Sequence, residues 1–403
     1  MRFPVRGPSF QLAALALVVL SLSATGFLMA RMLQAPEAAT DSGAGGSPEP
    51  RPQASHLFLE WPHDASPDLV LLLSGEQHGY IQPCGCSKPQ YGGLERRFNL
   101  LKSLIQGHGW HVVPLDLGDI AQHSGPQALL KYKYSMEALH QLNYQAVSVG
   151  MNEMTMPLLD ALAQYTLNSP QSPRVLVSNL QDKETNFPDM IGSWKVVGGA
   201  GQEPKVGVVG VVASSVGGPA QKLDRDVLRF QPAQNALNDT LRDGKFLAQT
   251  DLLALLFQGS LEEAQACAKQ FPQFRIILCL TKEEEPPANP TMVGNTMIIN
   301  VGHKGRYVGL VGIYRTNKPG QPFDLYYQLM QVGPEYETAQ GKDADNPILA
   351  LLENYTQEVR RGNYLAHYPK TLHPVQRQFP KATYVGSEVC QKCHPSAYQV
   401  WKN

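Results

Sequence analysis

Two cysteines and a histidine near the C-terminus have the spacing of a covalent cofactor site. They are Cys390, Cys393 and His394, in the run Cys-Gln-Lys-Cys-His. Two thiols about one helical turn apart can react with the two vinyl groups of a haem, and the adjacent imidazole can then bind the iron as proximal ligand. The pattern therefore predicts covalently bound haem c held by these three residues.

Three other interpretations of this motif compete. A thioredoxin-like redox pair normally opens a helix inside a complete α/β unit, whereas nine residues follow His394. A zinc knuckle needs further Cys or His ligands at short spacing, which do not follow here. A chance match is the third, and the export signal described next argues against it. His367 and His373 are candidates for the distal haem ligand, although a solvated linker histidine is the commoner role.

The N-terminus has the features of a segment that directs export. Residues 10–30 carry no charge, and Arg2 and Arg6 precede them. About 20 apolar residues span a bilayer as a helix, and arginines on the N-terminal side keep that end in the cytoplasm. A cleaved signal peptide is the alternative, with small residues at 21–25 as the cleavage site, but the length favours an uncleaved anchor. Both interpretations predict a periplasmic or otherwise extracytoplasmic protein.

The rest of the chain divides by composition. Residues 1–31 form the anchor, and residues 32–56, rich in Ala, Gly, Ser and Pro, are typical of a flexible linker. From 57 to 334, short apolar runs alternate with helical patterns, which predicts a layered α/β domain with a largely buried sheet. The expected strands are 69–74, 111–117, 146–149, 175–178, 206–212, 252–257, 276–280, 297–301 and 307–314, and the expected helices are 93–106, 127–142, 156–166, 233–248 and 260–270.

A helical linker is expected after this domain. Residues 335–380 are assigned to it, with a helix at 347–361 that begins after Asn346 and stops at Gly362. Its apolar residues share one face, so it is either a connecting helix or the last helix packed on the α/β domain. Residues 381–403 are then the start of a c-type cytochrome domain.

The charge balance argues against nucleic acid as a partner. Lysine and arginine number 34 and aspartate and glutamate 35, which gives a formal net charge of -1. A chain without excess positive charge has no overall attraction for a polyanion.

The haem motif also lies in a longer pattern. Gly386 and Ser387 precede it, and Pro395, Tyr398 and Trp401 follow it. The stretch GSEVCQKCHPSAYQVW resembles the opening of multihaem cytochrome c domains related to the tetrahaem cytochromes of nitrogen-oxidising bacteria. This resemblance implies electron transfer with redox partner proteins. It also implies further haem motifs downstream, so the end at Asn403 is expected to be a truncation, or the haem is completed in another way.

Six motifs between residues 74 and 309 follow one another in the order and spacing of a known family. They are SGEQHGYIQPCGC at 74–86, YGGLERRFNLL at 91–101, LDLGD at 115–119, LNYQAVSVGMNE at 142–153, VSNL at 177–180 and INVGHKGRYVG at 299–309. Together they resemble the metallophosphoesterase fold of the 5'-nucleotidase type. The resemblance implies two divalent metals at the C-terminal strand ends, which clamp a phosphate and activate a water.

The metal ligands of that family are only partly retained. By the resemblance, Glu76 replaces the first aspartate, while His78 and Asp119 are retained. Met151 and Asn152 stand where the pattern has Asn and His, and methionine is a poor ligand for a hard cation. A later histidine is replaced by Phe257 or Gln258, and the last histidine pair by Thr281-Lys282-Glu283-Glu284. A divalent metal held by Glu76, His78 and Asp119 is the remaining expectation; the alternative is that His78 only bonds the backbone and Asp119 only orders a loop.

Four cysteines lie outside the haem motif. Cys84 and Cys86 sit beside the metal motif, where a thiolate metal site, a redox pair or disulfides to Cys267 and Cys279 are all open. Cys267 and Cys279 are most simply buried apolar residues on a helix and a strand.

Three functions follow from these patterns. The first, favoured because its motif is intact, is electron transfer by an exported c-type cytochrome, with an inactive metallophosphoesterase-like domain as scaffold or sensor. The second is an exported, metal-dependent phosphoester hydrolase. The third is a module that binds a phosphorylated ligand without turnover. Since fold resemblance alone does not carry activity, no catalytic residue is assigned. A role without catalysis is favoured, and the alternative, if the chain is an enzyme, is a metal-dependent phosphoester hydrolase.

Overall fold

The computed structural model describes most of the chain after residue 56. The described ranges are 57–83, 89–123, 125–168, 172–181, 190–223, 228–383 and 385–402. The expected membrane segment at 10–30 and the linker at 32–56 lie outside these ranges. Within them, no helix combines the length and the apolar character needed to cross a membrane.

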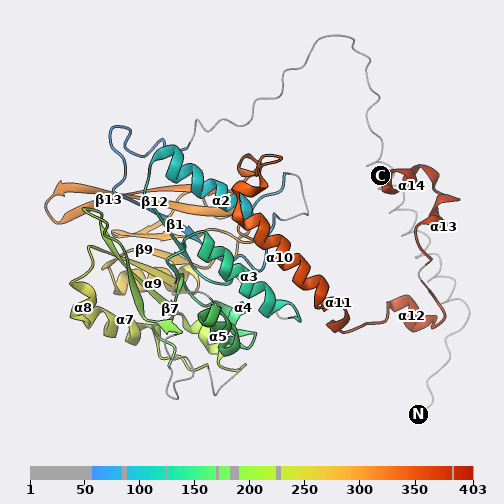
Figure 1. Cartoon of the computed structure of the whole chain (residues 1–403). Coiled ribbons are helices and arrows are strands. Elements are labelled where there is room, and N and C mark those ends of the chain that lie inside the picture. The colour runs from blue at the N-terminus through green and yellow to red at the C-terminus, as the bar shows by residue number, and fades with distance from the viewer. Residues whose placement is uncertain are drawn as a thin grey trace, which may run out of the picture. The chain divides into compact units, whose positions relative to one another are not determined.

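Two β-sheets form the centre of the α/β domain (Figure 1). In the first sheet, β1 to β5 run parallel and β12 and β13 are added antiparallel on the β1 side. Its order is β13 (Gln321–Gln331), β12 (Tyr307–Lys318), β1 (Leu69–Ser74), β2 (Val112–Asp116), β3 (Ala146–Val147), β4 (Arg174–Leu176) and β5 (Ile191–Gly192).

The second sheet has a parallel centre with an antiparallel strand at each edge. Its order is β10 (Thr291–Val293), β11 (Thr296–Ile299), β9 (Phe274–Cys279), β8 (Leu252–Gln258), β7 (Lys205–Val212) and β6 (Trp194–Gly198).

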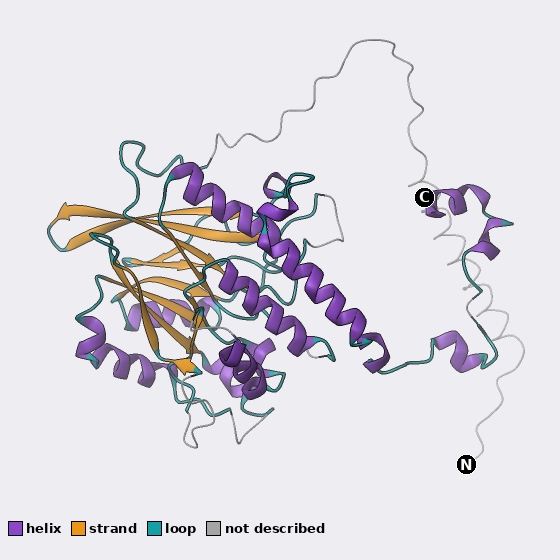
Figure 2. Cartoon of the chain, viewed as in Figure 1, coloured by secondary structure: helices purple, strands orange, loops and turns teal. Residues whose placement is uncertain are grey.

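The sheets pack face to face, and helices cover their outer faces (Figure 2). Alternate residues of β1 show why its sequence is apolar throughout: Leu71 packs between the sheets, while Leu72 packs against the helical layer. Burial of each such side chain contributes about 1.5–3 kcal/mol. The predicted layered α/β class is confirmed. Helices α2 (Leu94–Lys102) and α3 (Ala128–Gln141) cover the first sheet, and α7 (Ala233–Arg242) and α9 (Leu261–Gln270) cover the second.

Each of the nine expected strands is present, and the described residues form four further strands that the sequence pattern does not predict. Strand β13 does not stand out in the sequence because an edge strand is only half-buried and its polar residues interrupt the apolar pattern. Strands β5, β6 and β10 are short or lie at edges, with the same consequence. The remaining helical segments are η2 (Ser103–Gly107), α4 (Met151–Met154), α5 (Leu158–Asn168), α6 (Ser214–Ala220), α8 (Gly244–Leu247), η3 (Pro334–Tyr336) and η4 (Asp343–Asp345).

Helix α10 (Pro347–Arg361) has the bounds that its cap and stop signals predict. The Asn346 side chain accepts a hydrogen bond from the Ile348 N–H at 3.1 Å, which caps the first turn. Ile348, Leu351 and Leu352 are buried with residues of α2 and α3 in one apolar cluster. Of the two roles considered for this helix, these contacts show packing on the α/β domain.

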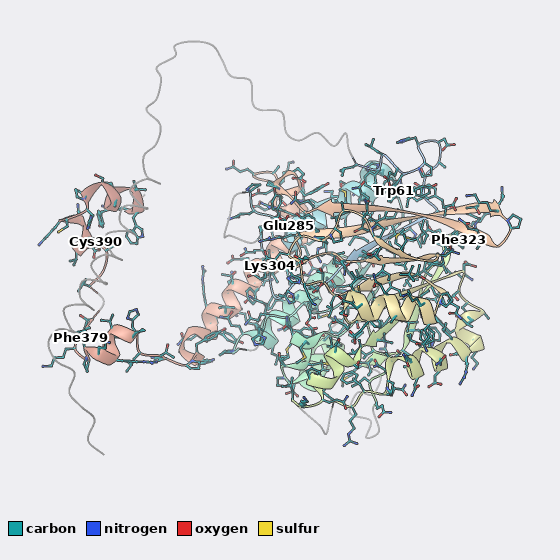
Figure 3. All side chains as sticks on the ribbon, turned by 180° about the vertical axis from the view of Figure 1, so that it is seen from behind. Trp61, Glu285, Lys304, Phe323, Phe379 and Cys390 are labelled. Atoms are coloured by element: carbon teal, nitrogen blue, oxygen red, sulfur yellow. The ribbon has the colours of Figure 1, made fainter. Side chains whose placement is uncertain are left out.

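An aromatic cluster fixes the start of the domain against β12. Trp61, which is labelled in Figure 3, stacks on Trp110 with ring centroids 5.2 Å apart. A Cβ at Gly312 would lie 2.6 Å from the Trp61 ring, so only glycine fits beneath it.

The described residues of the C-terminal segment form four short helices. They are α11 (Tyr364–His367), α12 (Pro374–Gln378), α13 (Glu388–Gln391) and α14 (Pro395–Lys402). Large apolar side chains stay exposed along it, among them Phe379, which is labelled in Figure 3, at 63% and Trp401 at 70%. The segment therefore builds no apolar core from its own described residues.

Candidate metal centre

Loops from both sheets meet at the carboxyl ends of the parallel strands. Glu76 and His78 follow β1, Asp119 follows β2, and His303 follows β11. The His78 N–H donates to the Asp119 carbonyl at 2.8 Å, and the Lys304 N–H donates to the Glu76 carbonyl at 2.9 Å. These backbone bonds lock the loops together, so side chains that are remote in sequence face one another.

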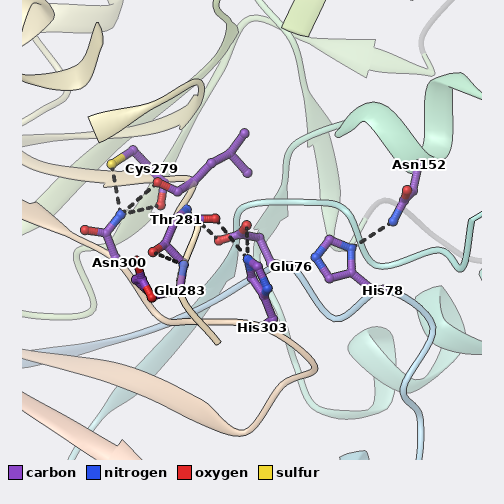
Figure 4. Close-up of polar contacts among 9 residues, drawn as sticks. Glu76, His78, Asn152, Cys279, Thr281, Glu283, Asn300 and His303 are labelled. Carbon is purple, nitrogen blue, oxygen red and sulfur yellow. Dashed lines mark hydrogen bonds and ion pairs between the residues drawn. The ribbon is translucent and has the colours of Figure 1, made fainter. Parts of the chain in front are cut away.

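Three of these side chains form a cluster with the donor types of a metal site. The ligand atoms of Glu76, His78 and His303 all lie within 4.8 Å of one another (Figure 4). The His303 Nε2 atom is 3.3 Å from Glu76 Oε1 and 2.9 Å from the Thr281 carbonyl oxygen. The Thr281 N–H donates to the other Glu76 oxygen at 3.1 Å. On the far side, the Asn152 amide is 2.9 Å from His78 Nδ1.

Burial perturbs the protonation of this cluster. It lowers the pKa of His78 to about 4, and the charges of His303 and Lys304 act in the same direction. Burial raises the pKa of Glu76, whereas the hydrogen bond to Glu76 raises the pKa of His303. His78 is therefore neutral near pH 7, and its Nδ1 accepts a hydrogen bond from the Asn152 amide.

The backbone of these loops is strained as well. Among the described residues other than glycine that have positive φ, four belong to this region: Glu76 at 47°, His78 at 49°, Asp119 at 53° and Lys304 at 65°. Such conformations cost energy and concentrate at functional sites.

The fold has well-characterised counterparts. No protein-family model matches the chain. The snake venom 5'-nucleotidase of Gloydius brevicauda is 25% identical over 279 residues, which cover 66% of this chain and 44% of that protein. The 5'-nucleotidase precursor from Thermus thermophilus superposes with a TM-score of 0.59 at 19% identity, over 73% of this chain and 59% of that one. The sulfate thiohydrolase SoxB from the same organism superposes with a TM-score of 0.61 at 15% identity, over 75% and 62%.

The α/β domain is 5'-nucleotidase-like in fold. The chain spans less than two thirds of the length of each of these relatives. The likeness fixes the architecture around the cluster and leaves its chemistry to the residues present.

Asp119 lies at the edge of the cluster and is held by backbone. Its Oδ1 accepts the Asn152 N–H at 2.8 Å. A Cβ on Gly150 would lie 2.3–2.5 Å from the Asp119 carboxyl group, so a larger residue there would displace it. Burial raises the pKa of Asp119 to about 6. The structure thus brings Glu76 and His78 together as expected and adds His303, whereas Asp119 is outside the three-residue group.

Glu153 connects the Asp119 loop to the start of α4 through hydrogen bonds. It is buried, and its carboxylate accepts the N–H groups of Asp119 at 2.9 Å, Ala121 at 2.8 Å and Gly150 at 2.7 Å. One side chain therefore satisfies donors of both the Asp119 loop and the start of α4.

The replaced ligand positions of the 5'-nucleotidase-like domain have other roles here. Met151 packs against the apolar core, and Phe257 points into the layer beneath α7 and α9. Gln258 is the residue that faces the site: its Nε2 donates to the Leu117 carbonyl at 2.6 Å, while its buried Oε1 has no partner among the described residues. Glu284 pairs with Lys304 and, at 3.0 Å, with Arg306. Two complete metal positions are not present among the described residues.

The sequence pattern does not identify His303 as a site residue, although this histidine lies in the family motif INVGHKGRYVG. The available signal was an imidazole next to Gly302 directly after a buried strand. Its proximity to Glu76 depends on the packing of two different sheets, which no local pattern reveals.

The cysteines separate into two environments. Cys84 and Cys86 lie outside the described residues. Cys267 and Cys279 are free and buried, as expected, whereas Cys390 and Cys393 are free and exposed.

We expect alkylation to follow this division. Burial raises the pKa of both Cys267 and Cys279 to about 12, so almost no thiolate forms at pH 8. In native protein without haem, peptide mass mapping after iodoacetamide treatment should show Cys390 and Cys393 modified at least about tenfold faster. Equal rates at Cys279 and Cys390 would contradict the buried position of Cys279.

The haem motif begins in α13 with Cys390 and ends with His394, directly before α14. The N–H groups of Cys393 and His394 donate to the Cys390 carbonyl at 3.2 and 2.8 Å. Both thiols are exposed on this turn. His373 receives the Val375 N–H on its Nδ1 at 3.2 Å and so caps α12, while His367 lies at the end of α11 and is exposed. The haem ligation stays a prediction.

Proposed function

We propose that the 5'-nucleotidase-like domain is a metal-dependent phosphoester hydrolase. The observation that carries the proposal is the cluster of Glu76, His78 and His303 at the carboxyl ends of strands from two sheets. Imidazole and carboxylate are suitable ligands for a divalent transition metal. When bound, such an ion polarises a phosphoryl oxygen and lowers the pKa of a coordinated water.

The cations next to the cluster support a phosphorylated substrate. Lys304 directly follows His303, and Arg306 lies two residues further. Both are held by the exposed carboxylate of Glu284. A phosphate oxygen would compete with that carboxylate for the same donors. The chain's own groups thus bind the anion, and the Asn152 amide holds the His78 ring in place.

The direct test is hydrolysis by the full chain. Protein stripped with a chelator and reloaded with Zn²⁺, Mn²⁺ or Mg²⁺ is assayed with bis-p-nitrophenyl phosphate and a nucleoside 5'-monophosphate. We expect turnover only after reloading, and a loss of at least about 100-fold in Glu76→Gln. Turnover that survives both the chelator and Glu76→Gln would place the activity elsewhere.

We expect Glu284 to weaken substrate binding. Its replacement in Glu284→Gln releases Lys304 and Arg306 from the carboxylate, so KM for an anionic phosphoester should fall by about two- to fivefold. Lys304→Ala should raise KM by a similar factor. Steady-state kinetics at low and high salt check both changes, and Asp324→Asn, which removes the remote pair with Lys318, is the control. An unchanged KM in both variants would exclude these cations from substrate binding.

A second function is favoured by the C-terminal turn, which we propose as a c-type haem site for electron transfer. It is supported by exposed Cys390 and Cys393 one turn apart with His394 adjacent. A pyridine haemochrome spectrum and intact mass on protein matured with a haem c system test it. We expect one covalent haem, absent from Cys390→Ala/Cys393→Ala. Apoprotein mass in the parent chain would rule the site out.

A further inference from the structure

We propose that Glu76, His78 and His303 form a mononuclear site, so that the domain binds one transition-metal ion instead of the two divalent ions implied by the family pattern. The inference rests on the metal-dependent function proposed above and deepens it by fixing the number and class of the ion. It does not require that the bound ion support turnover.

The geometry fits a single ion. Ligand atoms that bind one ion at about 2.0–2.2 Å lie within roughly 4.4 Å of one another, and the three ligand atoms here lie within 4.8 Å. Small side-chain rotations therefore complete the site. In the part of the chain that the structure describes, no other group of three His, Cys, Asp or Glu residues has ligand atoms within this distance of one another.

Neighbouring polar groups support the ligands instead of adding a second set. The Asn152 amide nitrogen donates to His78 Nδ1, and the other ring nitrogen faces Glu76 (Figure 4). Binding of an ion through that nitrogen moves the ring proton to Nδ1, where the amide oxygen of Asn152 accepts it once the amide group has turned. Asp119 Oδ1 is occupied by the Asn152 N–H. Groups that orient ligands in this way tune a metal site from outside.

A second ion would lack adequate ligands among the described residues. Two further oxygens are the second carboxylate oxygen of Asp119 and the unpartnered Oε1 of Gln258, whose amide nitrogen donates to the Leu117 carbonyl. Among the described residues, no further imidazole joins these two oxygens as a ligand for a second ion. Met151, at the family's amide position, packs into the core.

The donor set also selects the class of ion. Two imidazoles and one carboxylate, with further positions open to water or substrate, are typical of Zn²⁺ and Fe²⁺ sites. Mg²⁺ and Ca²⁺ prefer sites made of oxygen ligands. We therefore infer Zn²⁺-like or Fe²⁺-like selectivity over Mg²⁺.

The test measures metal binding without reference to activity. The full chain in a Cys390→Ser/Cys393→Ser background, which removes competing thiols, is stripped and titrated with Co²⁺ and Zn²⁺. Visible absorption of Co²⁺ reports its coordination, and elemental analysis gives the stoichiometry. We expect one ion per chain, and an affinity at least about 100-fold weaker in His303→Gln.

His111→Gln is the matched control. His111 Nδ1 is 2.7 Å from Glu203 Oε1, so it is also a histidine paired with a glutamate, but it belongs to a different part of the surface. Its Co²⁺ affinity should equal that of the parent. Circular dichroism and the unfolding midpoint of His303→Gln establish that the variant is folded.

The outcomes separate this inference from the hydrolase function. One ion per chain, lost in His303→Gln and kept in His111→Gln, supports it even if no phosphoester is hydrolysed. Two ions per chain, an intense thiolate-to-cobalt absorption band, or binding that survives His303→Gln but is lost in Asp119→Asn would overturn it, whether or not the protein hydrolyses phosphoesters.

Discussion

Replacing Asp116 with alanine is expected to lower the free energy of unfolding by about 3–5 kcal/mol. Asp116 is fully buried at the end of β2, and its Oδ2 lies 4.0 Å from Nη1 of Arg97, which is 1% exposed. Ser74 Oγ donates to Asp116 at 2.5 Å, and Arg97 donates to Tyr144 at 3.2 Å. Without the carboxylate, a guanidinium group remains buried with no opposing charge, and the Gly118 N–H loses its acceptor.

Urea unfolding of Asp116→Ala, measured with Glu337→Ala as a control, tests this expectation. Glu337 pairs with Arg96, which precedes Arg97 on α2. The Glu337 side chain is 62% exposed, so its loss should cost at most about 1 kcal/mol. The double variant Asp116→Ala/Arg97→Met should recover part of the loss, since neither charge is then buried alone. If Asp116→Ala and Glu337→Ala lowered the free energy of unfolding by similar amounts, the buried Asp116–Arg97 pair would contribute no more than the exposed one.

The second large effect is expected at Glu153. Glu153→Ala leaves the buried N–H groups of Asp119, Ala121 and Gly150 without their acceptor. Each orphaned donor costs about 1–3 kcal/mol, and because the three share one carboxylate their costs are not additive. We expect a total loss on the order of 4 kcal/mol, together with weaker order in the Asp119 loop.

The comparison for this variant is Glu263→Ala. Glu263 also accepts backbone N–H groups, those of Ser260 at 3.0 Å and Ser215 at 3.3 Å, but water reaches them more readily. Its loss should cost about 1 kcal/mol, the usual value of a helix cap. Thermal unfolding and hydrogen exchange at residues 119–121 distinguish the two. Unchanged exchange there in Glu153→Ala would contradict the bracing role.

The layered architecture could be predicted from the sequence because the central strands are buried on both faces. The run Leu69–Ser74 is wholly apolar up to its last residue, and its observed bounds are those expected. Helix α10 could be predicted equally well, because Asn346 caps it and Pro347 is its first residue. The edge strand β13 could not be predicted in this way. Its residues are mostly half-exposed, and its adjacent Tyr326 and Tyr327 break the period of two that marks a strand.

The candidate site could be predicted only where its parts lie in one loop. Glu76 and His78 are two residues apart, so the turn after β1 brings them together whatever the rest of the chain does. His303 joins them from the other sheet, and its role depends on a tertiary contact. The sequence did show which family ligands are absent, but not that an imidazole from elsewhere lies beside those that remain.

The pairing of β1 has a kinetic consequence. Leu69 lies opposite Ile313 on β12, although β1 begins the α/β domain and β12 comes near its end. One edge of this apolar strand thus stays open during synthesis until almost the whole domain has emerged. Non-local pairing of this kind is associated with slow folding, and an unpaired apolar strand is a site for aggregation. Misassembly of this protein is therefore most to be expected in chains that stop before β12.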